Sequence, residues 1–177
     1  MPEQAPHLTI RPARREDAPA LREIFNDAVE DGLATFHSTL RSVEEQKDLI
    51  GAAEEDSRRP LLVAELRNLV CGVVSIEPYE QELLGGEVGE VTVFVRRSFR
   101  SYGIGRQLMR VAQTEAARLG YRKLVGRVLA DNEESLQLCK ATGWRVVGVH
   151  EQQARHGSRL RDVAVVEYLL PAVPRVE

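Results

Sequence analysis

The stretch that decides the fold is residues 87–119, EVGEVTVFVRRSFRSYGIGRQLMRVAQTEAARL. Its first part, 87–95, is rich in β-branched residues and predicts a strand. A short basic turn with Gly103 and Gly105 follows, and Gly120 stands where a helix usually ends. The residues between predict an amphipathic helix, with an apolar stripe of Ile104, Leu108, Val111 or Ala112, Ala116 and Leu119. A strand, a glycine turn and a helix in this order favour phosphate binding, because glycines allow close approach and helix N-termini attract anions.

The spacing of the glycines excludes two common phosphate-binding motifs. A P-loop requires Gly, four residues and then Gly-Lys-Ser/Thr, and the sequence contains no such run. A dinucleotide fingerprint requires a third Gly or Ala at the position that Leu108 occupies. What remains is the pattern Arg100-x-x-Gly103-x-Gly105.

Length and composition are those of one small globular domain. The chain has 177 residues, and we expect a single domain over 1–177 with its core at about 8–171. The net charge of −3 gives no reason to expect nucleic acid or an anionic membrane as a partner. No run is apolar enough to span a membrane, and the first residues lack a signal-peptide core. Cys71 and Cys139 are too few for a disulfide framework or a metal site, so we expect a cytoplasmic protein without a metal.

The rest of the chain predicts a regular series of strands and helices. Strands are expected at 8–11, 61–66, 70–76, 123–129, 144–151 and 162–170. Helices are expected from Asp17 to Asp31, from the Ser42 capping box to about Glu55, and from an N-cap at Asp131 or Asn132 to about Ala141. The order is therefore β-α-α-β-β-β-α-β-α-β-β. Because only part of it alternates, we expect an α/β (α+β) fold with a mixed sheet and helices on both faces.

This order and the Arg-x-x-Gly-x-Gly turn resemble the GNAT superfamily of N-acetyltransferases over nearly the whole chain. Further segments are similar to its phosphinothricin and methionine sulfoximine (sulfone) acetyltransferases: Ile10-Arg11-Pro12-Ala13, the run Ile24 to Val29, Ala34-Thr35-Phe36, the strand Glu90 to Val95, Asn132-x-x-Ser135 with Thr142-Gly143-Trp144, and Gly157 with Asp162-Val163. The resemblance implies a twisted, mostly antiparallel sheet of about seven strands. It also implies a homodimer and acetyl-CoA as cosubstrate.

The implied reaction moves an acetyl group from acetyl-CoA to the primary amine of a small amino-acid-like acceptor. The amine attacks directly through a tetrahedral intermediate, and the resemblance places the general base at Glu90. Partial burial at the start of an apolar strand would make this carboxylate a better proton acceptor. The alternative is a solvated glutamate at a strand end, which is the usual state of this residue type.

The cofactor contacts are expected along the strand and the glycine turn. The backbone of the strand should hold the pantetheine arm, as a peptide adds to a sheet edge, and the amides of 101–106 should hold the pyrophosphate. The predicted set is Val93, Phe94, Val95, Arg100, Ser101, Tyr102, Gly103, Ile104, Gly105, Arg106, Asn132 and Ser135. For the two arginines the alternative is an exposed surface position. For Asn132 it is a helix N-cap, a role that a contact with the cofactor would not exclude.

Two further catalytic functions have candidates. The backbone N–H of Val93 is expected to stabilise the oxyanion, because no side chain nearby has a suitable donor. Many GNAT enzymes place a Tyr where this chain has Cys139, and the matching subfamily often has a His. Cys139 is therefore a candidate proton donor for the leaving thiolate, but a buried structural thiol is the commoner state, and the proton then comes from solvent.

The acceptor is the least determined part of the prediction. Candidate substrate-binding residues are Phe36, Tyr79, Leu83, Leu84 and Gly85. The subfamily often carries basic residues in the loop before the catalytic strand. Loop 77–87 here has four glutamates, at positions 77, 80, 82 and 87, and no Lys or Arg. An acidic loop suits a cationic amine, and the alternative is a solvated loop that does not touch the substrate. Arg155, His156 or Arg159 would still be available to a carboxylate. The subfamily's Trp in the loop 157–162 is also missing.

Three functions therefore remain open. The first is an N-acetyltransferase of the phosphinothricin and methionine sulfoximine type. The second is a GNAT acetyltransferase for a cationic small amine, a protein N-terminus or a lysine. The third is a non-catalytic acyl-CoA-binding module, against which Glu90 argues.

Overall fold

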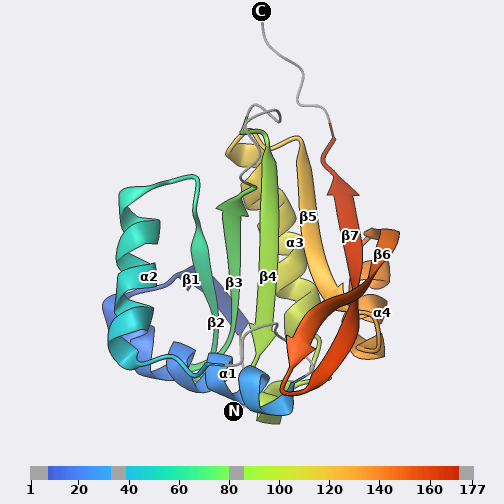
Figure 1. Cartoon of the computed structure of the whole chain (residues 1–177). Coiled ribbons are helices and arrows are strands. Elements are labelled where there is room, and N and C mark those ends of the chain that lie inside the picture. The colour runs from blue at the N-terminus through green and yellow to red at the C-terminus, as the bar shows by residue number, and fades with distance from the viewer. Residues whose placement is uncertain (1–7, 33–38, 80–85, 172–177) are drawn as a thin grey trace, which may run out of the picture.

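A seven-stranded sheet in the order β1-β2-β3-β4-β5-β7-β6 forms the centre of the protein (Figure 1). The structure is a computed structural model, and it describes residues 8–32, 39–79 and 86–171. The strands are β1 (Leu8–Pro12), β2 (Leu61–Leu66), β3 (Leu69–Pro78), β4 (Val88–Val95), β5 (Lys123–Leu129), β6 (Arg145–His156) and β7 (Arg159–Leu169). Neighbouring strands pair antiparallel except β4 and β5, which are parallel. The predicted mixed, mostly antiparallel sheet is confirmed.

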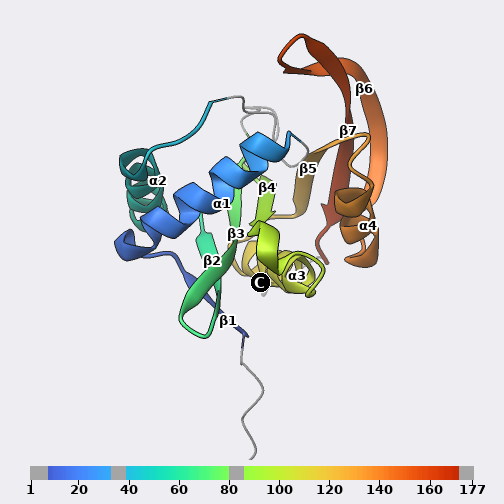
Figure 2. The ribbon, with the colours of Figure 1, turned by 90° about the horizontal axis from the view of Figure 1, so that it is seen from below.

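Helices cover both faces of the sheet, as predicted. They are α1 (Ala18–Asp31), α2 (Val43–Glu55), α3 (Ile104–Arg118) and α4 (Glu133–Ala141), with 3₁₀ turns at Arg15–Asp17 and Arg97–Phe99. Figure 2 shows α1 and α2 on one face and α3 and α4 on the other. No helix in the described ranges is long and apolar enough to cross a membrane.

Two apolar cores match the two faces of the sheet. The larger core packs α3 against the central strands, and the predicted stripe supplies its buried residues Ile104, Leu108, Ala112 and Ala116. The smaller core packs α1 and α2 on the other face, with Leu21, Ile24 and Ile50 against Val63 and Val73. Because strand side chains alternate between faces, β2 and β3 contribute to both cores.

Helix boundaries follow the predicted signals. Ser42 and Glu45 form the reciprocal capping box at the start of α2, and Asn132 accepts the Ser135 N–H at the start of α4. Asp17 precedes α1 as predicted but does not cap it, because its carboxylate binds Arg11 and the Arg14 N–H instead.

The last two strands are longer than the sequence predicts. β6 continues to His156 rather than ending near Glu151, and β7 begins at Arg159 rather than Asp162. The segment 150–161 is polar and lacks a β-branched run, so its strand signal is weak. It is extended because it pairs with itself as a hairpin, after an irregularity between His150 and Ala154.

Candidate active site

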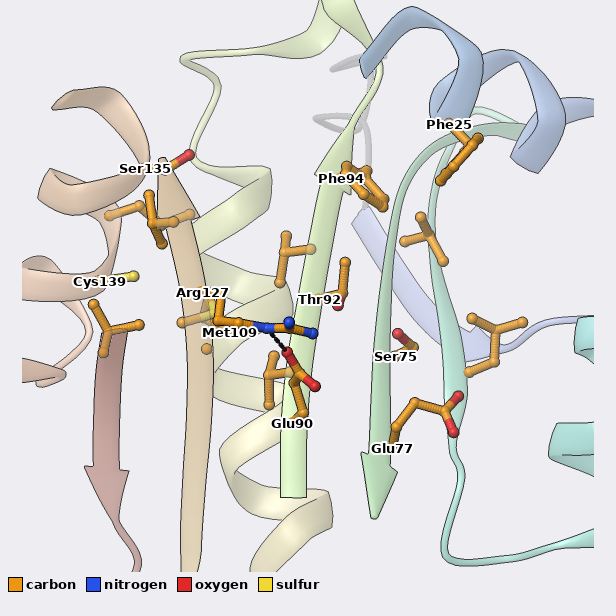
Figure 3. A pocket seen from close by; sticks show the side chains of 18 of the residues that line it. Phe25, Ser75, Glu77, Glu90, Thr92, Phe94, Met109, Arg127, Ser135 and Cys139 are labelled. Atoms are coloured by element: carbon orange, nitrogen blue, oxygen red, sulfur yellow. Dashed lines mark hydrogen bonds and ion pairs between the residues drawn. The ribbon is translucent and has the colours of Figure 1, made fainter. Parts of the chain in front are cut away.

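The site begins where the sheet divides. β4 and β5 pair only from Val88↔Lys123 to Glu90↔Val125, and the two strands then separate toward their C-terminal ends (Figures 1 and 3). A sheet that opens in its middle leaves part of a central strand without a neighbour on one side. That opening is the natural place for an extended ligand to add to the sheet.

The alternation of backbone groups identifies which residues of β4 face this opening. The Val88 carbonyl accepts the Tyr79 N–H, and the Arg96 N–H donates to the Cys71 carbonyl, so both groups face β3. Because backbone groups alternate along an antiparallel pair, those of 91, 93 and 95 face β5. Beyond Glu90 this is the side on which β5 has turned away. The structure thus directs the Val93 and Val95 backbone into the opening.

A cavity of about 290 Å³ passes through the opening and reaches both faces of the sheet. On one face its walls come from α1, α2 and the strands β2 to β4. On the other face they come from α3, α4 and the residue before β6, including Met109, Cys139 and Trp144. This volume is near the lower end of small-molecule pockets. The cavity brings together the predicted residues Glu90, Val93, Phe94, Asn132, Ser135 and Cys139.

Polar side chains form a cluster on the floor of the cavity, amid apolar walls. The strand register places Ser75 opposite Thr92 and Glu77 opposite Glu90 on one face of the sheet (Figure 3). Glu90 accepts a hydrogen bond from Arg127 Nε on β5 at 2.6 Å, across the point where the strands separate. Glu77 accepts one from Arg59 Nη1 at 2.8 Å. The floor is therefore a set of carboxylates matched with guanidinium groups.

Glu90 occupies a position suited to proton transfer. It is the last residue of β4 that pairs with β5, and its side chain is 22% exposed. It is thus partly buried within the strand and faces the cavity, unlike the solvated strand-end glutamate of the alternative interpretation. Its role as the base stays a prediction.

The glycine turn has the backbone conformation of a helix N-terminus that can receive an anion. Ser101 (φ 66°) and Gly103 (φ 78°) are left-handed, and the Gln107 N–H to Gly103 carbonyl bond opens α3. The N–H groups of Ile104, Gly105 and Arg106 come before this first bond, so they have no acceptor within the helix. A Cβ on Gly105 would meet Leu138 Cδ2 of α4 at 3.1 Å, so glycine also keeps α3 and α4 close.

The arginines near this turn differ in their surroundings. Arg100 Nη2 pairs with Asp31 Oδ2 at 2.6 Å, and Arg97 Nη2 with Asp31 Oδ1 at 2.7 Å. Burial opposes the ionisation of Asp31, but the hydrogen bonds from Arg100 and then Arg97 outweigh it and lower the pKa of its carboxyl. Arg100 therefore ties the turn to the end of α1, whereas Arg106 and Tyr102 are exposed. Their predicted contacts with a pyrophosphate stay predictions.

The α4 side of the cavity carries the other cofactor and proton-donor candidates. Asn132 caps α4 through Ser135, so the N-cap interpretation holds, and both residues also line the cavity. Cys139 is buried, and burial raises the pKa of its thiol to about 11. A thiol of this kind remains protonated at neutral pH, which is consistent with a structural role.

The predicted acceptor contacts are only partly within the described residues. Phe36, Leu83, Leu84 and Gly85 lie outside them. Tyr79 follows β3 and donates its backbone N–H to Val88, and the described lining of the cavity does not include it. His156 and Arg159 line a second hollow, beside Asp31 and Asp131.

Sequence reasoning missed most of the acceptor face of the cavity. The missed lining residues are Phe25, Arg41, Gln46, Arg59, Ser75, Glu77, Thr92 and Arg127. For Ser75, Glu77 and Thr92 a signal exists, because they place polar groups on one face of otherwise apolar strands. Arg127 is likewise a charged residue in the middle of a mostly apolar strand. The residues on α1 and α2 give no such signal, because only the packing of those helices on the sheet brings them here.

Comparison with known proteins agrees with this geometry. The model of the acetyltransferase (GNAT) family matches residues 19–144. A phosphinothricin N-acetyltransferase of Streptomyces viridochromogenes is 26% identical over 98% of this chain and 94% of its own length. An L-methionine sulfoximine/L-methionine sulfone acetyltransferase of Salmonella typhimurium is 27% identical over 92% and 95%.

Solved structures share the fold over nearly their full length. A ribosomal-protein-alanine N-acetyltransferase of Brucella melitensis is 31% identical, covers 92% of this chain and 99% of its own, and superposes with a TM-score of 0.87. The acetyltransferase yncA of Salmonella typhimurium, solved with acetyl-CoA, has a TM-score of 0.88 at 24% identity over 96% and 98%. The chain belongs to the acetyltransferase (GNAT) family, whose enzymes take their acetyl group from acetyl-CoA.

Proposed function

We propose that this enzyme acetylates the primary amine of a small amino-acid-like acceptor of the phosphinothricin or methionine sulfone type. The observation that carries the proposal is the position of Glu90. It stands at the point where β4 and β5 separate, between an open strand edge and a cavity that reaches both faces of the sheet. The names of the two curated relatives support the acceptor class.

The cofactor half of the site would hold acetyl-CoA mainly through backbone groups. Val93 and Val95 offer N–H and C=O groups to a pantetheine arm along the open edge. The free amides at the start of α3 suit a pyrophosphate, because they lie at the positive end of the helix dipole. The bound cofactor supplies the thioester carbonyl.

The proton-transfer half would act through Glu90. A primary amine is largely protonated at neutral pH, so Glu90 must take a proton from it, directly or through a water molecule. The Arg127 guanidinium holds one oxygen of Glu90 at 2.6 Å, which leaves the other oxygen to meet the amine. The Val93 N–H would stabilise the oxyanion of the tetrahedral intermediate.

We further propose a homodimer in the cytoplasm. β6 is the edge strand of the sheet and carries Val146, Val147 and Val149, each more than half exposed. An exposed apolar edge strand is suited to pairing with a second chain. The free thiols of Cys71 and Cys139 fit a reducing compartment. A light-scattering mass tests the dimer.

A second candidate acceptor is a protein N-terminus. It is favoured by the similarity to the Brucella melitensis enzyme, which at 31% identity acts, by its name, on an alanine of a ribosomal protein. The glutamates of the loop before β4 would also suit a cationic acceptor.

An acceptor panel decides between these functions. Release of free thiol from acetyl-CoA is measured with L-phosphinothricin, L-methionine sulfone, spermidine and a peptide that begins with alanine. We expect the highest kcat/KM with one of the two amino acids. A preference for the peptide or spermidine would replace the acceptor class, and no thiol release with any amine would contradict the enzymatic function.

A further inference from the structure

Arg41 is held at the mouth of the acceptor half of the cavity by a pair of hydrogen bonds. Its backbone N–H donates to Asn26 Oδ1 at 2.9 Å, and its carbonyl accepts from Asn26 Nδ2 at 3.1 Å. Asn26 is itself buried in α1. An amide that satisfies both backbone groups of one residue fixes that residue in place, so Arg41 is anchored although it lies outside any helix or strand.

The Arg41 guanidinium faces the cavity with an aromatic ring beneath it. Its central carbon lies 3.9 Å from the centre of the Phe25 ring, and both residues line the cavity. Burial lowers the pKa of Arg41, and only the electrostatic attraction of Glu45 opposes that effect. The ring stacks on one side of the guanidinium plane and leaves its N–H edge available for a planar anion.

Arg41 differs from the other arginines of the cavity in its partners. Arg59 binds Glu77, and Arg127 binds Glu90. Within the described ranges no carboxylate forms an ion pair with Arg41. Half-buried charges in folded proteins are normally paired, so an anchored guanidinium that lacks a protein carboxylate fits a site for an external anion.

A second, independent group points to the same ligand. Gln46 lies in the first turns of α2, is only 3% exposed, and lines the same cavity. Among the described residues its buried Nε2 has no hydrogen-bond partner. A buried amide donor without an acceptor is costly, typically by about 1–3 kcal/mol. An anion held by Arg41 would provide the missing acceptor.

We infer that Arg41 and Gln46 form the receptor for the carboxylate of the amine substrate, and so select amino acids over simple amines. The inference rests on the proposed acetyl transfer and deepens it. The receptor is formed by Gln46 of α2 and by Arg41, which lies two residues before α2 and is held there by Asn26 of α1. It therefore supplies the positive charge that the loop before β4 lacks, because that loop has no Lys or Arg. It also holds the carboxylate of the substrate away from Glu90, which takes the proton from the substrate's ammonium group.

The test compares acceptors that differ in one group. L-methionine sulfone, its α-carboxamide and 3-(methylsulfonyl)propylamine share the sulfone and the primary amine, and only the first bears a carboxylate. The value of kcat/KM is measured for each with saturating acetyl-CoA, in the wild type and in Arg41→Gln. We expect Arg41→Gln to lower kcat/KM for the amino acid about ten- to hundredfold more than for the other two, as loss of a charged hydrogen bond predicts, mainly through KM.

Three further variants separate recognition from folding. Arg41→Lys keeps the charge but not the fork of donors, so it should recover part of the loss. Gln46→Leu should also lower kcat/KM more for the amino acid than for the other two acceptors, but by a smaller factor than Arg41→Gln. Arg118→Gln removes a charge from an exposed α3 pair with Glu115 and should leave all three acceptors unchanged. Thermal unfolding of each variant reports any structural damage.

The outcomes distinguish this inference from the proposed function. An equal effect of Arg41→Gln on all three acceptors, with acetyl transfer intact, would overturn the receptor and keep the function. If no acceptor is acetylated, calorimetric titration of L-methionine sulfone into the coenzyme A complex decides. If L-methionine sulfone binds the wild type and Arg41→Gln abolishes this binding, the receptor is supported although the proposed function is not. If the wild type does not bind it, or if Arg41→Gln binds it equally well, the receptor is overturned.

Discussion

The two halves of the cavity are built from different parts of the chain. On the cofactor side, the candidate groups are mostly backbone amides of β4 and of the turn before α3, and their side chains are small, exposed or apolar. On the acceptor side, they are side chains contributed by six separate elements or their flanks, and they include a network of carboxylates and guanidinium groups. Backbone recognition tolerates many residues provided that the conformation is kept, whereas side-chain recognition depends on each residue type. Substitutions should therefore act differently on the two sides.

The largest effect is expected from one side chain on the acceptor side. Glu90→Gln keeps the size of the residue but removes the proton acceptor, so kcat at neutral pH should fall by about two to four orders of magnitude. The KM for acetyl-CoA should change little, because the cofactor is held elsewhere. Steady-state thiol release measures both, and the deficit should shrink at high pH, where the amine loses its proton unaided.

The matched control for this variant is Glu87→Gln. Glu87 lies just before β4 and pairs with Arg122 at 3.2 Å, outside the described lining of the cavity. It should retain wild-type kcat. Unchanged turnover in Glu90→Gln would remove Glu90 from the mechanism and weaken the contrast between the two halves.

A smaller effect is expected from a backbone change on the cofactor side. Gly103 is left-handed at the start of α3, and Gly120 is left-handed beyond its end, and neither has an atom near the position of a Cβ. A β-branched residue in this conformation costs about 1–3 kcal/mol at either position. Gly103→Val should weaken coenzyme A binding about tenfold by calorimetry, whereas Gly120→Val should lower stability alone. Equal coenzyme A affinity in both variants would argue against the turn as the pyrophosphate site.

The same contrast explains which features the sequence predicts. The 87–119 segment encodes its strand, its turn and its helix locally, through β-branched residues, two glycines and an apolar stripe, and all three elements lie where predicted. The separation of β4 from β5 is not a local property, because it depends on how far β5 follows β4 before it turns toward β7.

The acceptor side shows why side-chain sites are harder to predict. Arg41 and Phe25 are 16 positions apart and meet only because Asn26 clamps the backbone of Arg41. Arg127 reaches Glu90 from a strand 37 positions further along the chain. No periodicity links such pairs, so a single sequence identifies Glu90 through its resemblance to a family but not the arginines around it.

The smallest effect is expected from a side chain on the cofactor side. Burial raises the pKa of Cys139 to about 11, so the thiol stays neutral through the physiological range and ionises only well above it. Proton transfer from it to a thiolate with an ordinary thiol pKa of about 8.5 is uphill by roughly 3 kcal/mol. Cys139→Ala should therefore leave kcat within about threefold of wild type from pH 6 to pH 9, whereas a true proton donor would contribute about a hundredfold or more.

The measurable cost of Cys139→Ala should be in thermal stability, because the substitution leaves a small cavity beside Trp144 and Met109. A hundredfold loss of kcat at unchanged stability would assign catalysis to this thiol, and the cofactor side would then depend on a side chain as the acceptor side does.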